Sequence, residues 1–219
     1  MGSQGLPSTE VRYVDAAGVE VSTTVGAVDV DRLARALPVR RFGSHRGQRH
    51  RSGLFWSATT RGHVPYESRL ELDRLWLADF DPAVTWIAAQ PMWLSGRQEG
   101  CLHRHVPDFL LTRRGLPPLI VDVKPEEFAA RPEAQGVFAW TDQVCRAAGW
   151  GYQVWTGADP VVLANIRTLA VARRFLPPTG GLEEGSMLAL LSEVWTGRRV
   201  VDLSVPLSSS DLRRVEAAS

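Results

Sequence analysis

The segment Leu119–Pro125, with the sequence LIVDVKP, constrains the fold more than any other part of the chain. A short and nearly continuous apolar run is typical of a central strand that is buried on both faces of a sheet. Asp122 and Lys124 interrupt the run, and because side chains alternate along a strand we expect them on one face. Charged side chains inside a sheet are costly unless they meet a partner. The segment therefore predicts a buried sheet with a charged site on its central strand.

The patterns on either side of this strand predict one mixed α/β sheet flanked by helices. An amphipathic pattern predicts a helix over Tyr66–Phe80, and alternation predicts strands over Ala83–Gln90 and His103–Leu111. Between Val39 and that helix, we expect a loop with a single strand. The other expected elements are a hairpin over Val11–Val25, strands over Gly53–Ala58, Met92–Ser95, Tyr152–Thr156 and Arg199–Leu203, and helices over Val28–Leu37, Glu133–Ala148, Pro160–Phe175 and Glu183–Trp195.

Composition excludes several classes of protein. Apolar residues make up 44% of the chain and charged residues 22%, which is typical of a soluble globular protein rather than a disordered one. The sequence contains no apolar run long enough to span a membrane, and residues 1–10 show no secretory signal. Cys101 and Cys145 can form neither a disulfide framework nor a zinc site of the CxxC type. We therefore expect a cytoplasmic protein.

Three carboxylates and one lysine are placed in an order that suggests phosphodiester chemistry. Glu71 lies on the predicted helix, Asp108 in the strand segment HVPDFLL, and Asp122 two residues before Lys124, the only lysine of the chain. Each feature alone is common by chance, so the weight rests on the order of the set. Convergent carboxylates are hard oxygen ligands that suit Mg²⁺.

The chemistry expected of this set follows from charge, because a phosphodiester repels an incoming hydroxide. Mg²⁺ held by Asp108 and Asp122 would neutralise the phosphate and lower the pKa of a bound water. Glu71 would bind the metal or its water shell. Lys124 would orient the attacking water or stabilise the charge that develops in the transition state.

These residues resemble the catalytic domain of TnsA, the endonuclease subunit of heteromeric transposases, within the PD-(D/E)xK superfamily. The similarity lies in SRLELDRLWLADFDPAVTWIAAQP, HVPDFLL and VDVKP. The S-x-L-E helix of that family matches Ser68–Glu71, which favours Glu71 over Glu67. The resemblance implies an α/β, restriction-endonuclease-like fold with a mixed central sheet flanked by helices. The implied catalytic set is Glu71, Asp108, Asp122 and Lys124, and the expected ligands of Mg²⁺, or Mn²⁺ in its place, are Glu71, Asp108, Asp122 and the backbone carbonyl of Val123.

The resemblance also sets the expected domains and partners. We expect an N-terminal extension with a hairpin and a helix over residues 1–38, a nuclease domain over 39–175, and a short helical C-terminal extension over 176–219. The family implies cleavage of DNA at transposon ends together with a DDE-type transposase. It also implies an ATPase regulator as a partner. In the family a C-terminal domain contacts this regulator, and residues 176–219 form a shorter segment than that domain. A stand-alone nuclease for phage defence or junction processing, and a non-catalytic DNA-binding module, remain open alternatives.

A basic stretch from Arg32 to Tyr66 contains eight arginines and no acid. We expect it to contact DNA phosphates, although a solvated basic loop would have the same composition. The residues expected to bind DNA are Arg40, Arg41, Arg46, Arg49 and Arg51. His103 and His105 are expected to be structural or close to a phosphate rather than metal ligands. In a regular strand they would lie on the face opposite Asp108.

Replacing Arg46, Arg49 and Arg51 with Ala should weaken DNA binding and flatten its dependence on salt, because each lost phosphate contact reduces the slope of log K against log[salt] by about 0.9. Fluorescence anisotropy over a series of salt concentrations measures this slope. An unchanged slope would show that the basic stretch does not contact DNA.

Overall fold

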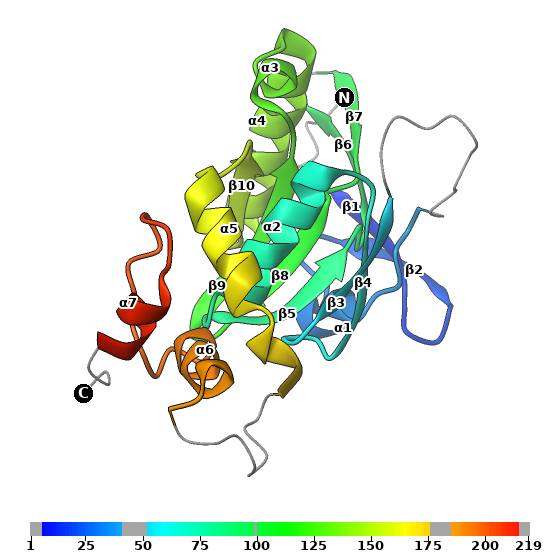
Figure 1. Cartoon of the computed structure of the whole chain (residues 1–219). Coiled ribbons are helices and arrows are strands. Elements are labelled where there is room, and N and C mark those ends of the chain that lie inside the picture. Colours follow the sequence, from blue (N-terminus) through cyan, green and yellow to red (C-terminus); the bar gives the residue numbers. More distant parts are fainter. Residues whose placement is uncertain (1–5, 41–51, 99, 176–184, 215–219) are drawn as a thin grey trace.

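The structure, a computed structural model, describes residues 6–40, 52–98, 100–175 and 185–214, and it is a mixed α/β fold (Figure 1). Its centre is a four-stranded sheet in the order β10-β9-β8-β5. These strands are β5 (Val84–Ala89), β8 (Phe109–Arg113), β9 (Leu116–Val123) and β10 (Gly151–Trp155). Strand β9 runs antiparallel to β8 and parallel to β10. The prediction of a buried central strand is confirmed.

A second four-stranded sheet packs against the first, and all its neighbouring strands are antiparallel, in the order β2-β1-β6-β7. It contains β1 (Glu10–Val14), β2 (Glu20–Thr24), β6 (Trp93–Gln98) and β7 (Cys101–His105). The predicted N-terminal hairpin is confirmed as β1 and β2. Val11 and Leu94 point into the core that the two sheets share.

The two direct crossings of the chain between these sheets lie at the same place. The prediction of one strand over His103–Leu111 was wrong, because β7 ends at His105 in one sheet and β8 begins at Phe109 in the other. Pro107 lies between them and has no N–H to continue a ladder. The crossing from β5 to β6 contains Pro91 in the same way. The N–H of Gln90 donates to the carbonyl of Asp108 at 2.8 Å, so the two crossings are joined.

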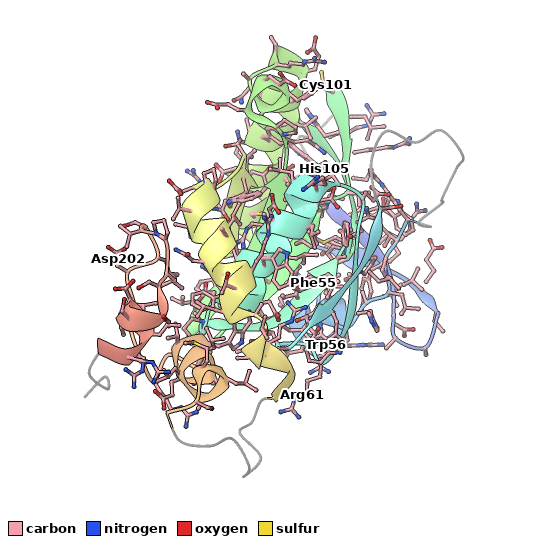
Figure 2. The ribbon with its side chains drawn as sticks, in the orientation of Figure 1. Phe55, Trp56, Arg61, Cys101, His105 and Asp202 are labelled. Atoms are coloured by element: carbon pink, nitrogen blue, oxygen red, sulfur yellow. The ribbon has the colours of Figure 1, made fainter. Side chains whose placement is uncertain are left out.

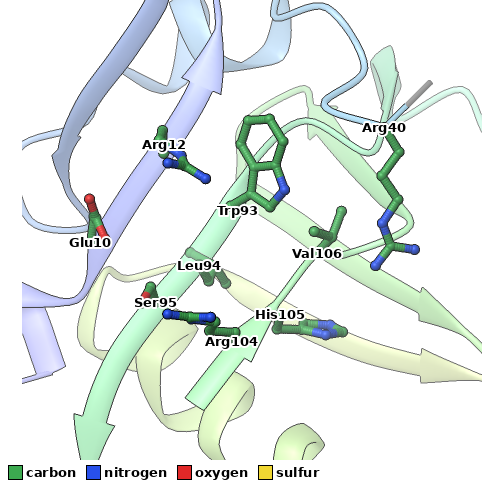
Figure 3. Close-up of a pocket in the computed structure, with 9 residues that line it drawn as sticks. All are labelled: Glu10, Arg12, Arg40, Trp93, Leu94, Ser95, Arg104, His105 and Val106. Atoms are coloured by element: carbon green, nitrogen blue, oxygen red, sulfur yellow. The ribbon is translucent and has the colours of Figure 1, made fainter. Parts of the chain in front are cut away.

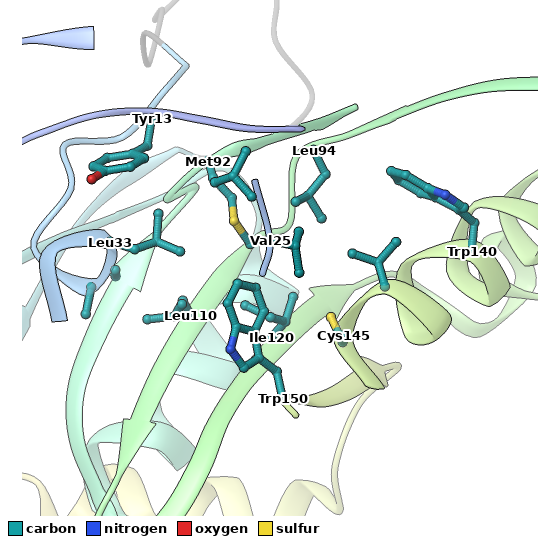
Figure 4. Packing of buried hydrophobic residues seen from close by; sticks show 14 residues of the cluster. Tyr13, Val25, Leu33, Met92, Leu94, Leu110, Ile120, Trp140, Cys145 and Trp150 are labelled. Atoms are coloured by element: carbon teal, nitrogen blue, oxygen red, sulfur yellow. The ribbon is translucent and has the colours of Figure 1, made fainter. Parts of the chain in front are cut away.

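Helices cover both faces of the central sheet. Helix α2 (Arg69–Phe80) packs on one face, with Leu75 and Ala78 in a cluster that includes Phe109 and Val121. Helix α4 (Pro132–Ala147) packs on the other face and helps to fill the space between the sheets. Its Trp140 belongs to a second cluster, which Figure 4 shows with Leu110, Ile120 and Leu94. The remaining helices of this region are α1 (Val30–Ala34), α3 (Glu126–Ala129) and α5 (Pro160–Leu169).

Several predicted boundaries were wrong for local reasons. Helix α2 begins at Arg69, because Ser68 caps it by accepting from the N–H of Glu71 at 3.1 Å. Tyr66 instead ends β4 (Gly62–Tyr66), which pairs with β3 (Gly53–Ser57) in a hairpin where a single strand was expected. Helix α1 is shorter than Val28–Leu37. Helix α5 ends at Leu169, and a 3₁₀ helix, η2 (Ala172–Phe175), follows it.

The C-terminal extension packs against α5. It contains α6 (Met187–Trp195) and α7 (Ser209–Arg214), whereas the strand expected over Arg199–Leu203 does not form. Asn165 on α5, the only asparagine of the chain, donates to the carbonyls of Leu203 and Val205. These bonds give two backbone carbonyls of the extended segment the donors that a neighbouring strand would otherwise supply. A short 3₁₀ helix, η1 (Leu6–Ser8), precedes β1. Within the described ranges, no helix has the length and apolarity needed to cross a bilayer.

Asp79 near the end of α2 holds the β3–β4 hairpin in place. Its buried carboxylate accepts from the hydroxyl of Ser57 at 2.6 Å and from the N–H groups of Ala58 and Thr59 at 3.1 and 2.9 Å. The guanidinium of Arg173 lies 3.7 Å from the same carboxylate. One buried charge thus joins α2, the hairpin and η2.

Asp79→Ala should lower the free energy of unfolding by about 3 kcal/mol, because it leaves the buried donors around Asp79 without their acceptor. Urea denaturation measures the loss. The control is Asp142→Ala, which removes an exposed pair with Arg146 on α4 and should change stability by about 0.5 kcal/mol or less. Equal losses in the two variants would contradict the role assigned to Asp79.

Candidate active site at the sheet junction

Asp108 lies where the chain enters the central sheet, one residue before β8. Its side chain is largely buried, with 7% of the residue exposed. One carboxylate oxygen accepts from the backbone N–H of Val123 at 2.7 Å, and the same oxygen lies 4.0 Å from the ammonium nitrogen of Lys124. The structure therefore brings together two of the predicted residues, Asp108 and Lys124. The side chain of Lys124 is 45% exposed, so its ammonium group lies at the boundary between this carboxylate and solvent.

The pKa of Asp108 is raised from 3.8 to about 6, chiefly because burial disfavours the carboxylate. The positive charge of Lys124 acts against this, and the negative charges of Asp122 and Glu71 add to it. The charges of the other three predicted catalytic residues therefore all act on Asp108. Together they carry more negative than positive charge when the carboxyl groups are ionised.

Glu71 also has a structural role, at the N-terminus of α2. Its carboxylate accepts from the N–H of Glu67 at 2.8 Å and from the hydroxyl of Ser68 at 2.8 Å, at the start of α2. This is a form of the capping box, in which a helix cap and a glutamate three residues later bond to each other. The pKa of Glu71 is raised, chiefly by burial, and the charge of Lys124 opposes that shift. The cap fixes the position of this carboxylate.

Asp122 is fully buried and is held by two residues that sequence reasoning did not assign to the site. Both of its carboxylate oxygens lie 2.8 Å from Nε2 of His105, and the hydroxyl of Tyr152 donates to one of them at 2.5 Å. Burial and the neighbouring charge of Asp122 raise the pKa of Tyr152, so the phenol keeps its proton and acts as a donor. Asp122 therefore faces the layer between the two sheets.

His105, which Figure 2 labels, reaches Asp122 because it closes β7 and points into that layer. The expected strand parity, which separated His105 from the carboxylates, fails because β7 and β8 belong to different sheets. Apart from the proline that separates the two strands, no sequence pattern indicates this contact. Tyr152 could have been found from the pairing of β10 with β9, which sets Val154 beside Asp122 and so brings Tyr152 to the neighbouring position on the same face.

The backbone of Val123 also faces Asp108. Its N–H donates to that carboxylate, whereas the next N–H, that of Lys124, donates to the carbonyl of Trp155 in β10. Since the N–H and C=O of one residue point to the same side of a strand, the carbonyl of Val123 is also directed away from β10. This is the side on which Asp108 lies.

Gln90 is a strained residue at the same junction. Its φ is 44°, a left-handed conformation that is uncommon for a residue other than glycine. Its side-chain amide is buried and makes no hydrogen bond to any residue that the structure describes. Strained backbone and unsatisfied polar groups of this kind concentrate at functional sites.

The donors at the junction fit a hard divalent cation. Within the described part of the chain, no three histidine, cysteine or acidic side chains are gathered closely enough to form a metal cage by themselves. Mg²⁺, however, is usually bound through one or two carboxylates and several waters. Asp108 offers a buried carboxylate of raised pKa, Glu71 a second one, and Val123 a carbonyl. A cation at this place would offset the excess negative charge.

The arginines expected to bind DNA are only partly placed. Arg40 is exposed and lines a groove on the outer face of the second sheet. The other four, Arg41, Arg46, Arg49 and Arg51, lie outside the described residues.

Comparison with known proteins adds no family assignment to this geometry. No family model matches the chain, and no curated protein matches its sequence. The case for a function therefore rests on the residues of the site and on the fold that positions them.

Asp108→Asn should stabilise the protein at pH 8 by up to about 3 kcal/mol, since a shift from 3.8 to about 6 is worth about 1.4 kcal/mol per pKa unit. The folded pKa is the higher one, so the wild type loses stability as the pH rises through about 4 to 6. The difference between variant and wild type should vanish below pH 4. Urea denaturation across this pH range measures it.

The control is Asp202→Asn on the surface, where hydrogen bonds from Ser204 lower the pKa of the carboxyl group. Because its pKa is lower in the folded than in the unfolded chain, the ionised Asp202 carboxylate stabilises the fold, so this variant should be no more stable than the wild type at pH 8. A stability gain from Asp108→Asn that does not depend on pH would contradict the burial of a charged carboxylate.

Proposed function

We propose that this protein is a Mg²⁺-dependent DNA endonuclease of the TnsA-like, restriction-endonuclease-like type. The observation that carries the proposal is the buried Asp108 carboxylate, with its raised pKa, beside the only lysine of the chain. An acid that is costly to ionise and a cation at the solvent boundary form a site suited to phosphate chemistry.

The order of elements supports the nuclease fold in the proposal. A helix, three strands, a second helix and a last strand follow one another as α2, β5, β8, β9, α4 and β10. The first three strands are antiparallel, and the last is parallel to the central one. The hairpin of β6 and β7 is an insertion into this order. The carboxylates of Asp108 and Asp122 lie at one end of the central strand, and the first turn of α2 contributes that of Glu71.

The residues of the chain have distinct roles in the proposed reaction. Asp108, the carbonyl of Val123 and Glu71 would hold Mg²⁺, or Mn²⁺ in its place. Asp122, which was expected from the sequence to be among the ligands, is buried against His105 and Tyr152, so here we give it the role of a negative charge behind the metal. The bound cation supplies neutralisation of the phosphate and a lower pKa for a coordinated water. Asp108 must be ionised to take part, so activity should fall as the pH drops below about 6.

Lys124 provides the positive charge that the reaction itself needs. Its ammonium group faces Asp108 and is exposed on its other side, so it can donate to a phosphate oxygen or to the attacking water. An electrostatic donor fixed before the reaction stabilises the charge that develops in the transition state. In the wider proposal, the DNA is a transposon end and the partner is a DDE-type transposase.

Asp108→Ala and Lys124→Ala should each reduce nicking of plasmid DNA in Mg²⁺ by at least about 100-fold, because each removes a group that acts on the reacting phosphate. DNA affinity should stay close to that of the wild type. Gel assays of supercoiled DNA measure nicking, and anisotropy without divalent cations measures binding.

The matched control is Glu133→Gln, an exposed acid at the start of α4. It should nick DNA as the wild type does. A wild type that nicks no DNA with Mg²⁺ or Mn²⁺, or an Asp108→Ala variant with full activity, would refute the proposed function.

A further inference from the structure

A groove of about 510 Å³ lies on the second sheet, beside the candidate active site. Figure 3 shows Trp93 between Arg12 and Arg40, with Arg104 and His105 below them. Its volume is in the range of sites that bind small ligands.

Strand register places the main side chains of the groove on the outer face of this sheet. Arg12 on β1 is directly opposite Trp93 on β6, and Ser95 on β6 is directly opposite Arg104 on β7. Residues that are directly opposite each other point to the same face. The neighbouring residue Leu94 is buried in the core, so this row points away from it. The groove is therefore built on rigid strands rather than on loops.

The groove combines positive charge with a flat aromatic surface. Arg12, Arg40 and Arg104 face a single acid, Glu10, among the groove residues. The guanidinium of Arg12 lies over the ring of Trp93, 4.8 Å from the ring centre. Arg12 also pairs with Glu20 at the outer edge of the sheet, at 3.3 Å, which holds it in this position. Arginines for phosphates and a fixed indole for bases are the usual components of a single-strand binding surface.

His105 connects the groove to the candidate active site. It lines the groove, and its Nε2 lies 2.8 Å from the carboxylate of Asp122. The side chain of His105 shares the inner face with Leu94, so a polymer bound along the outer groove would pass the end of β7, from whose other face His105 reaches Asp122.

We infer that this groove binds unpaired DNA, with a base against Trp93 and its phosphates on Arg12 and Arg104. This inference rests on the proposed nuclease function, because that function requires a strand to lie beside Asp108 and Lys124, just after the crossing at which the groove ends. The inference adds that the strand to be cut is unpaired where it lies on the outer face of the second sheet. Duplex DNA is then held elsewhere, and only an unpaired segment next to the cut enters the groove.

The test measures binding of fluorescent oligothymidine to the full chain in EDTA, so that no cleavage is needed. Trp93→Leu keeps an apolar side chain but removes the stacking surface, and it should weaken binding by roughly 10-fold, on the scale of one base stacked on an aromatic ring. Arg104→Ala, at an exposed position, should reduce the slope of log K against log[salt] by about 0.7, the value for one contact with a single strand. Arg146→Ala, on the exposed side of α4, is the matched control and should change neither quantity.

A second arm compares a blunt DNA duplex with the same duplex carrying a single-stranded tail. Wild type should bind the tailed duplex more tightly, and Trp93→Leu should abolish that preference while binding the blunt duplex as before. If neither variant changes the affinity for oligothymidine or the salt slope, the groove does not bind unpaired DNA, even if the wild type nicks DNA. Loss of binding in these variants, in a protein that nicks no DNA, would uphold the groove and refute the proposed nuclease. Circular dichroism of each variant shows that it is folded.

Discussion

The hydrogen bond from the backbone of Val123 to the carboxylate of Asp108 is the contact on which the junction depends. It joins Val123, the last residue of β9, to Asp108, the residue just before the neighbouring strand β8, at the point where the chain changes sheets. A buried backbone N–H must find an acceptor, and at this end of β9 the neighbouring strand has not yet begun. The carboxylate supplies that acceptor. The same bond therefore completes the sheet and fixes a charged group at its end.

This arrangement has a cost that bears on function. Holding Asp108 away from water raises its pKa, and the negative charges of Asp122 and Glu71 raise it further, so the folded protein carries unfavourable charge near neutral pH. Lys124 offsets only part of this, because its side chain is half exposed. A junction selected for stability alone would use neutral acceptors for the same N–H. Three acids in this place make sense if a cation and a phosphate are part of the working state.

The sequence predicts the central sheet better than it predicts the contacts of the candidate site. The central strand, the helix after it and the N-terminal hairpin follow from local patterns, because burial on both faces and alternation leave clear signals in Leu119–Val123 and Val11–Val25. The change of sheet at Pro107 left the alternation of His103–Leu111 intact, so the pattern suggested one strand where two exist. Glu71 was favoured over Glu67 only through the resemblance of Ser68–Glu71 to the S-x-L-E helix of the family, and its capping bonds were not foreseen. Tyr152 follows only once β10 is paired with β9, and His105 could not be placed, because its contact with Asp122 joins two sheets.

The clamp on Asp122 shows why the two sheets and the proposed chemistry belong together. His105 reaches this carboxylate from the second sheet and Tyr152 from the edge strand of the first, so Asp122 stays in place only while both sheets are packed. Hydrogen bonds that orient carboxylates from behind set both the direction and the strength of the groups in front of them. His105 is also a wall of the outer groove. Because the imidazole of His105 points inward to Asp122, a strand in the outer groove would act on the carboxylates only through the end of β7, which carries His105 on its inner face and Arg104 on its outer face.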